Sequence, residues 1–285
     1  MKRDDFRLLH RLRVRWAEVD MQKIVFNGHY LMYFDTAMAD YWRALALPYE
    51  ATMHALGGDL YVKKASVEYH ASARYDDQLE VGLKCQRIGN SSLQFVGAIF
   101  CGDQLLITSE LIYVYANPAT QTSLPVPQSL RDIMLGFEAG EAVTTCQVDT
   151  WQDLQDRAQT VRTEVFVNEQ GIKAEDEWDA ADATAVHAVL SNRYGVPLGT
   201  ARLLQPEKNV AQIGRMAVTR LMRGSGFGRA LVDALMQVAK ERGDKEVRLH
   251  AQRSAEGFYK RQGFVVHGEP FDEVGIAHIE MRKSL

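Results

Sequence analysis

A glycine-rich turn gives this sequence its clearest chemical signal. The turn reads Arg223-Gly224-Ser225-Gly226-Phe227-Gly228 and joins a strand-like apolar run at 213–218 to a helical pattern at 227–239. Glycines let the backbone turn tightly and approach a ligand closely. The helix that follows directs unpaired N–H groups and its positive dipole end into the turn. These properties predict a site for a phosphate group.

The charges around the turn favour the same interpretation. No Asp or Glu occurs between Glu207 and Asp233, whereas four arginines do, namely Arg215, Arg220, Arg223 and Arg229. The turn lacks the Lys-Ser/Thr ending of an ATP-binding P-loop, and no second βαβ unit with a ribose-binding acid is evident. The alternative is a structural turn beside a solvated arginine face.

A second candidate for chemistry is Asp20, which lies eight residues before Gly28, where a long helical pattern begins. A carboxylate there could act as base or nucleophile on a carbonyl held at the helix N-terminus, whose free N–H groups would stabilise the developing oxyanion. An Asp before a helix is more often a cap or part of a surface turn. The residues alone leave both interpretations open.

The glycine-rich turn resembles the acetyl-CoA motif of the GNAT acyltransferases, Arg/Gln-x-x-Gly-x-Gly/Ala, with Arg223, Gly226 and Gly228 at its fixed positions. Residues 247–265, VRLHAQRSAEGFYKRQGFV, resemble the second motif of that family. The resemblance implies that Tyr259 is the general acid that protonates the departing CoA thiolate. It also implies that CoA is held by Met216, Ala217, Val218, Arg223, Gly224, Ser225, Gly226, Phe227, Gly228, Arg229 and Gln252, the last in place of the family's common Asn.

The segment at 162–189 is similar to the ElaA-like and YjcF-like branch of the GNAT family. The matching residues are Arg162, Val165, Phe166, Val167, Glu169, Gln170, Glu177, Asp179, Asp182 and His187. Five acids between Glu175 and Asp182 could favour a cationic acceptor or form a solvated loop. His187 could be a general base or a structural histidine. The spacing fits no standard ligand pattern, so no metal site is expected.

Residues 17–35 resemble the active-site region of hotdog-fold acyl-CoA thioesterases of the 4-hydroxybenzoyl-CoA and YbgC/FadM kind. Their pattern of an Asp, a Val-Tyr/Phe-x-x-x-Tyr group and a long helix is matched by Asp20, Ile24, Val25, Phe26 and Tyr30. The resemblance implies that Asp20 is the catalytic carboxylate and that backbone N–H groups at Asn27 and Gly28 polarise the thioester carbonyl. Many relatives carry His or Tyr at the position of Asn27. A second subunit completes the site in that family, which implies a homodimer or larger assembly.

The elements that must position these residues form two predicted domains. An opening strand at 7–16 and an amphipathic helix at 28–47 precede strands near 58–72, 77–88, 91–101 and 104–116 and a helix at 128–137. This order predicts a hotdog domain at 1–138, a curved antiparallel sheet around a long central helix. After a linker at 139–142, residues 143–285 are predicted to form a GNAT domain with a mixed, mostly antiparallel sheet and flanking helices. The fold class is α+β.

Composition excludes several classes of partner. The chain is 46% hydrophobic and 25% charged, and residues 1–140 carry 14 basic and 16 acidic side chains against 19 and 21 in the remainder, a net −2 each. Neither half has the basic surplus of a nucleic-acid binder. No signal peptide or apolar run of roughly 18 residues is present, which predicts a cytoplasmic protein without a membrane partner.

Three functions are compatible with these features. The first is a bifunctional enzyme that hydrolyses acyl-CoA thioesters in its N-terminal domain and transfers an acetyl group from acetyl-CoA to an amine in its C-terminal domain. The second is an acetyltransferase whose hotdog half serves as an oligomerising or acyl-CoA-binding module. The third is a protein that binds CoA in both halves without turnover. Acetyl-CoA and acyl-CoA are expected as substrates, with no tightly bound cofactor.

Overall fold

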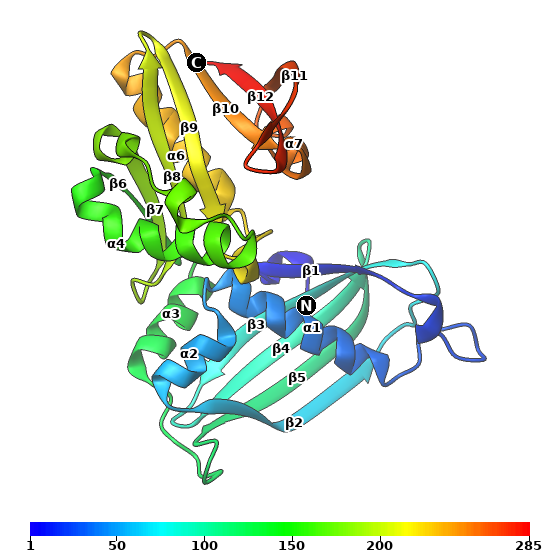
Figure 1. Cartoon of the computed structure of the whole chain (residues 1–285). Coiled ribbons are helices and arrows are strands. Elements are labelled where there is room, and N and C mark those ends of the chain that lie inside the picture. Colours follow the sequence, from blue (N-terminus) through cyan, green and yellow to red (C-terminus); the bar gives the residue numbers. More distant parts are fainter. The chain divides into compact units, whose positions relative to one another are not determined.

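The computed structural model describes residues 1–285, which form two units, Met1–Val143 and Thr144–Leu285. The first unit is built on a five-stranded antiparallel sheet in the order β1-β3-β4-β5-β2 (Figure 1). Its strands are β1 (Leu8–Arg13), β2 (Asp59–Tyr69), β3 (Gln78–Ile88), β4 (Ser92–Cys101) and β5 (Gln104–Ala116). Because β1 and β2 are the outermost strands, each has one edge without a partner in this sheet.

Helix α1 (His29–Ala44) packs on one face of this sheet through an aromatic stripe. The buried side chains are Tyr30, Tyr33, Phe34, Ala37, Met38, Tyr41 and Trp42. At Gly97 on β4 an added side-chain carbon would lie 2.3 Å from the ring of Phe34, so glycine is required for this packing. Helices α2 (Tyr49–Leu56) and α3 (Gln128–Glu138) complete the unit. The predicted hotdog architecture is confirmed.

The second unit contains a seven-stranded sheet in the order β11-β12-β10-β9-β8-β7-β6. Its strands are β6 (Thr144–Asp149), β7 (Val186–Asn192), β8 (Pro197–Glu207), β9 (Val210–Val218), β10 (Glu246–Gln252), β11 (Val265–Glu273) and β12 (Ile276–Ser284). All neighbours are antiparallel except β9 and β10, which run parallel. The predicted mixed, mostly antiparallel sheet is confirmed.

Two long helices cover opposite faces of this sheet, because alternate strand residues point to opposite sides. Leu154 and Ala158 of α4 (Trp151–Arg162) pack on Val189 of β7. The next residue of β7 is paired with Gly199, which lies against Leu231 of α6 (Phe227–Arg242). Short helices α5 (Ala174–Glu177) and α7 (Glu256–Lys260) lie in the connections.

Helix α4 changes its form at its C-terminal end. It is α-helical to Arg162 and continues as a π-helical segment, Thr163–Glu169. Wide turns of this kind are uncommon and often occur at functional sites. None of the chain's helices has the length and hydropathy that a membrane crossing requires.

Strands β9 and β10 separate part of the way along the sheet. Their pairing runs only from Val210 and Glu246 to Ile213 and Leu249, although β9 continues to Val218 and β10 to Gln252. A bulge against β8 falls in the same stretch of β9, and Arg215 there has a left-handed φ of 49°. The separation leaves unpaired strand edges facing each other in the middle of the sheet.

Candidate active sites

The glycine-rich turn of the second unit has the geometry of an anion site. Gly224 and Gly226 have φ values of 86° and 84°, a conformation that favours glycine. No side chain caps α6, and the first N–H that bonds back to the turn is that of Ala230, to the carbonyl of Gly226 at 3.2 Å. The N–H groups of the first helical residues therefore remain available to an anion. We call residues 223–229 the phosphate loop.

Side chains of the phosphate loop take other partners. Arg223 donates through both terminal nitrogens to the carboxylate of Glu169 and through Nε to the carbonyl of Val218. The ring of Phe227 is buried, and Arg229 pairs with Asp233 at 3.4 Å on the surface of α6. Contacts from this loop to a pyrophosphate would therefore come mainly from main-chain N–H groups.

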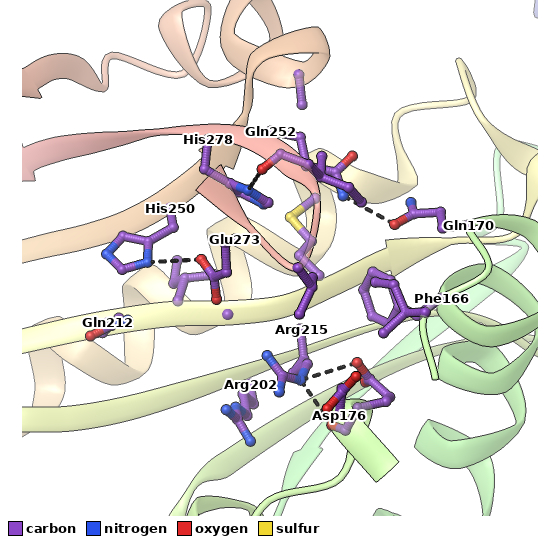
Figure 2. Close-up of a pocket in the computed structure, with 18 of the residues that line it drawn as sticks. Phe166, Gln170, Asp176, Arg202, Gln212, Arg215, His250, Gln252, Glu273 and His278 are labelled. Carbon is purple, nitrogen blue, oxygen red and sulfur yellow. Dashed lines mark hydrogen bonds and ion pairs between the residues drawn. The ribbon is translucent and has the colours of Figure 1, made fainter. Parts of the chain in front are cut away.

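A pocket of about 390 Å³ opens where β9 and β10 separate (Figure 2). Three of the residues predicted to contact CoA or to act in catalysis line it, Met216, Gln252 and Tyr259. Gln252 donates to the side-chain oxygen of Gln170 at 3.1 Å, which links β10 to the end of the π-helical segment. The structure thus gathers the second GNAT-like motif and β9 around one cavity.

Tyr259 lies at the edge of this pocket with 8% of its surface exposed. Its hydroxyl donates to the sulfur of Met216 at 3.2 Å. Burial raises the pKa of Tyr259 to about 12. The phenol therefore remains protonated at neutral pH, as a proton donor requires.

The five acids at 175–182 fall into two groups, because Glu175 and Asp176 are exposed whereas Glu177, Asp179 and Asp182 are paired with arginines. Arg162, with 1% of its side chain exposed, bonds to the carboxylates of Glu177 at 2.5 Å and Asp182 at 2.8 Å. Arg202 forms ion pairs with both Asp179 and Asp182. Arg215 adds contacts to Glu177 at 3.2 Å and Asp179 at 3.0 Å. Three arginines thus balance three carboxylates, which leaves no excess charge from this network to select a cationic acceptor.

His187 belongs to the same buried cluster, and the structure supports its structural interpretation. Its Nε2 donates to the carbonyl of Asp182 at 2.9 Å, and its ring lies on that of Trp151. Burial lowers the pKa of His187. The residue does not line the pocket, which makes it unsuited to take a proton from a bound amine.

The pocket also contains residues that sequence reasoning missed. His250, Glu273 and His278 come from β10, β11 and β12 and lie on the side of the pocket opposite the arginine network (Figure 2). His250 lies two residues before Gln252, so strand alternation puts both on one face, a signal that was available from the sequence. Glu273 reaches the pocket through the pairing of β10, β12 and β11, which no local pattern reveals.

In the first unit, Asp20 lies at the tip of a short hairpin. Val19 is bridged to Val25, and the N–H of Asp20 bonds to the carbonyl of Ile24 at 2.9 Å. The carboxylate of Asp20 accepts the N–H of Gln22 at 2.8 Å and is partly exposed. This is the geometry of an Asx turn, which leaves the second carboxylate oxygen available to a ligand.

Asn27 and Gly28 follow the second arm of this hairpin and lead into α1. The carbonyl of Asn27 accepts the hydroxyl of Tyr69 at 3.3 Å, and Gly28 precedes the first helical residue, His29. No side chain caps this helix. The start of α1 therefore combines available N–H groups with a carboxylate carried on the adjoining hairpin.

Comparisons with known proteins agree with the two folds. Residues 22–108 match the family model of the thioesterase superfamily, and residues 151–285 match that of the acetyltransferase (GNAT) domain. A Bacillus subtilis protein named "Putative acetyltransferase" is 35% identical over 142 residues, 48% of this chain and 94% of that protein. An Aquifex aeolicus protein named "Putative esterase" is 30% identical over 95 residues, 33% of this chain and 73% of that protein. The crystal structure of Escherichia coli ElaA is 26% identical, covers 49% of this chain and 99% of its own, and has a TM-score of 0.45.

Each unit thus has the fold of an enzyme class that acts on acyl-CoA. The chain belongs to the thioesterase superfamily through its first unit and to the GNAT acetyltransferases through its second.

Proposed function

We propose that the chain is a bifunctional acyl-CoA enzyme. The first unit hydrolyses acyl-CoA thioesters, and the second transfers the acetyl group of acetyl-CoA to an amine. The observation that carries the proposal is the pocket at the separation of β9 and β10, which contains Tyr259 and lies on the strand that leads into the phosphate loop. That arrangement would provide a place for the pyrophosphate, a slot for the pantetheine arm and a proton donor for the thiolate.

Acetyl transfer in the second unit needs orientation more than a reactive group. The unpaired edges of β9 and β10 would bind the pantetheine arm as an added strand, while the N–H groups at the start of α6 would bind the pyrophosphate. The amine would attack the acetyl carbonyl from the side of the pocket opposite the pantetheine arm. Tyr259 would give its proton to the departing thiolate.

Hydrolysis in the first unit would use Asp20 as base or nucleophile. The N–H groups at Asn27 and Gly28 would stabilise the oxyanion that forms on the thioester carbonyl. The Asx turn at Asp20 also suits a purely structural residue. That observation favours a second candidate function, in which the first unit only binds acyl-CoA or holds copies of the chain together.

The surface beside this hairpin supports assembly into a homodimer. Strand β2 has an unpaired edge, and the apolar side chains exposed on it and around α1 are Phe26, Leu31, Met32, Tyr61, Val62 and Tyr69. An exposed strand edge flanked by apolar side chains is a common site of pairing with another chain. We infer that a second copy covers this surface and completes the thioesterase site.

Two measurements test the proposal. Acetyl-CoA should protect residues 211–240 from hydrogen exchange, and release of free CoA thiol from a panel of acyl-CoAs should proceed without an amine. Absence of protection would reject the acetyl-CoA site of the second unit. Hydrolysis that is as fast in Asp20→Ala as in the unchanged chain would reject the role of Asp20.

A further inference from the structure

Acetyl transfer to an amine requires a group that removes a proton, and the pocket contains few candidates. Simple alkylamines are protonated at neutral pH, and only the unprotonated form attacks a carbonyl. Two of the lining carboxylates, Glu177 and Asp179, are held by arginines. These contacts lower the pKa of Asp179 to about 2, with the hydrogen bond from Arg202 as the largest cause. Asp179 is therefore unsuited to accept a proton from an amine, and Glu177, whose pKa burial raises, is already occupied by its contacts with Arg162 and Arg215.

Glu273 has different partners. It is the last residue of β11, and its carboxylate lies 3.3 Å from Nδ1 of His250 on β10. No arginine or lysine pairs with it. Figure 2 shows Glu273 beside His250, away from the contacts between Arg215 and the acidic segment. Among the lining carboxylates, Glu273 therefore combines access to the pocket with a partner that can itself carry a proton.

The surrounding aromatic contacts hold this pair in place. The ring of Phe271 meets that of His250 edge to face, with centroids 4.9 Å apart, and stacks on that of His278. Nδ1 of His278 donates to the carbonyl of Ile276 at 2.8 Å, which fixes that ring. The side chains of Phe271 and Glu273 project from the same face of β11 because they are two residues apart. Glu273 is thus placed by the sheet rather than by a loop.

We propose that Glu273 is the catalytic base of the acetyl transfer and that His250 passes its proton to solvent. The inference deepens the proposed function of the second unit and rests on it. Glu273 accepts a proton from the acceptor's ammonium group, and the amine nitrogen then forms a bond to the acetyl carbonyl carbon as the C–S bond breaks. Tyr259 protonates the CoA thiolate, and the second proton that the nitrogen loses on becoming an amide passes to the Tyr259 phenolate. The products are an N-acetyl amine, CoA and one proton, which leaves through His250.

The same geometry assigns a class of acceptor. A carboxylate that is not neutralised by an arginine attracts an ammonium group, and the neighbouring Arg215 is already balanced by Glu177 and Asp179. The other acid on the pocket wall, Asp176, is exposed on α5 and adds to the negative potential. The acceptor class is therefore an amine that is cationic in solution.

The test compares two small amines of similar size, ethylamine, which is protonated at neutral pH, and 2,2,2-trifluoroethylamine, which is largely neutral. CoA release is measured in the full chain carrying Asp20→Asn, which removes the proposed hydrolytic background. Glu273→Gln should lower kcat/KM for ethylamine by about 10²–10⁴-fold. The loss for trifluoroethylamine should be less than about tenfold, because that amine needs no base before it attacks. Glu269→Gln, an exposed glutamate on the same strand, is the matched control.

Equal losses for the two amines, or no loss, would overturn the role of Glu273. A loss of the ethylamine reaction in Asp176→Asn but not in Glu273→Gln would identify Asp176 as the base and would also overturn the role of Glu273. If the parent chain acetylates no amine in a wider panel, the proposed acetyl transfer fails, a result distinct from failure of the base.

A binding measurement tests, without turnover, whether an ammonium group binds at Glu273. Ethylammonium chloride should shift the ring resonances of His250 in the NMR spectrum of the acetyl-CoA-free chain, and Glu273→Gln should abolish the shift. A shift of equal size in both proteins, or none in either, would show that ammonium does not bind at Glu273.

Discussion

The guanidinium of Arg223 donates two hydrogen bonds to the carboxylate of Glu169, at 2.7 and 2.6 Å. Glu169 ends the π-helical segment, and Arg223 begins the phosphate loop, so the pair joins two elements that lie 54 residues apart in the sequence. The next residue, Gln170, makes the contact to Gln252 on β10. Two consecutive side chains therefore connect the π-helical segment to both predicted CoA-binding motifs.

Loss of this pair should weaken CoA binding without slowing the chemical step. The Glu169–Arg223 pair is partly exposed and is worth about 0.2–1 kcal/mol. Glu169→Gln should therefore raise KM for acetyl-CoA about two- to fivefold at an unchanged kcat. Glu241→Gln, on the exposed face of α6, serves as the control. Tighter binding in Glu169→Gln would mean instead that Glu169 competes with the pyrophosphate for Arg223.

The buried arginine network should be essential to the stability of the second unit. Arg162 contacts Glu177 and Asp182 and lies 4.5 Å from the centroid of the Trp178 ring. Arg162→Met leaves two buried carboxylates short of a partner and should lower the free energy of unfolding by about 3–5 kcal/mol. Urea unfolding of the full chain measures this, with hydrogen exchange assigning the transition to residues 144–285. Arg157→Met, on the same helix, should change the value by less than about 0.5 kcal/mol.

Much of the fold follows from local patterns. The aromatic stripe of α1 and the turn residues between β3, β4 and β5 place these elements within a few residues of their observed bounds. The acidic segment was harder to interpret, because its arginine partners come from positions 162, 202 and 215 and meet it only after the sheet has formed. Glu273 could not be connected to the pocket for the same reason. Both the arginine contacts of the acidic segment and the position of Glu273 depend on pairing between strands that are distant in the sequence.

Disruption of the exposed edge of β2 should separate copies of the chain. Val62 has 59% of its surface exposed on this edge strand. In a symmetric dimer, Val62→Lys would bring the lysine of one chain against the lysine of the other, and the two charges would repel each other. Light scattering should therefore report a monomer. Val196→Lys, an exposed apolar position in the second unit, should leave the mass unchanged. A parent chain that is already monomeric would reject the proposed interface.

The pKa of Tyr259 predicts the alkaline behaviour of the transfer. A proton donor with an ordinary tyrosine pKa would lose half of its activity by about pH 10, whereas burial raises the pKa of Tyr259 to about 12. Because the acid form persists until the pH approaches 12, kcat for acetyl transfer should show no decline between neutral pH and about pH 10. Steady-state rates across this range check the expectation. A decline centred at about pH 10 or below would contradict the raised pKa of the proton donor.

The central claim is that two separate sites in one chain act on the same kind of thioester. The most direct test measures CoA release from acetyl-CoA and longer acyl-CoAs with and without an amine, in Asp20→Asn, Tyr259→Phe and the exposed control Asp103→Asn. Asp20→Asn should lower only the amine-independent release, and Tyr259→Phe only the amine-dependent release, each by about 10²–10⁴-fold. If one substitution abolished both reactions, or if neither changed either, the assignment of one reaction to each unit would be contradicted.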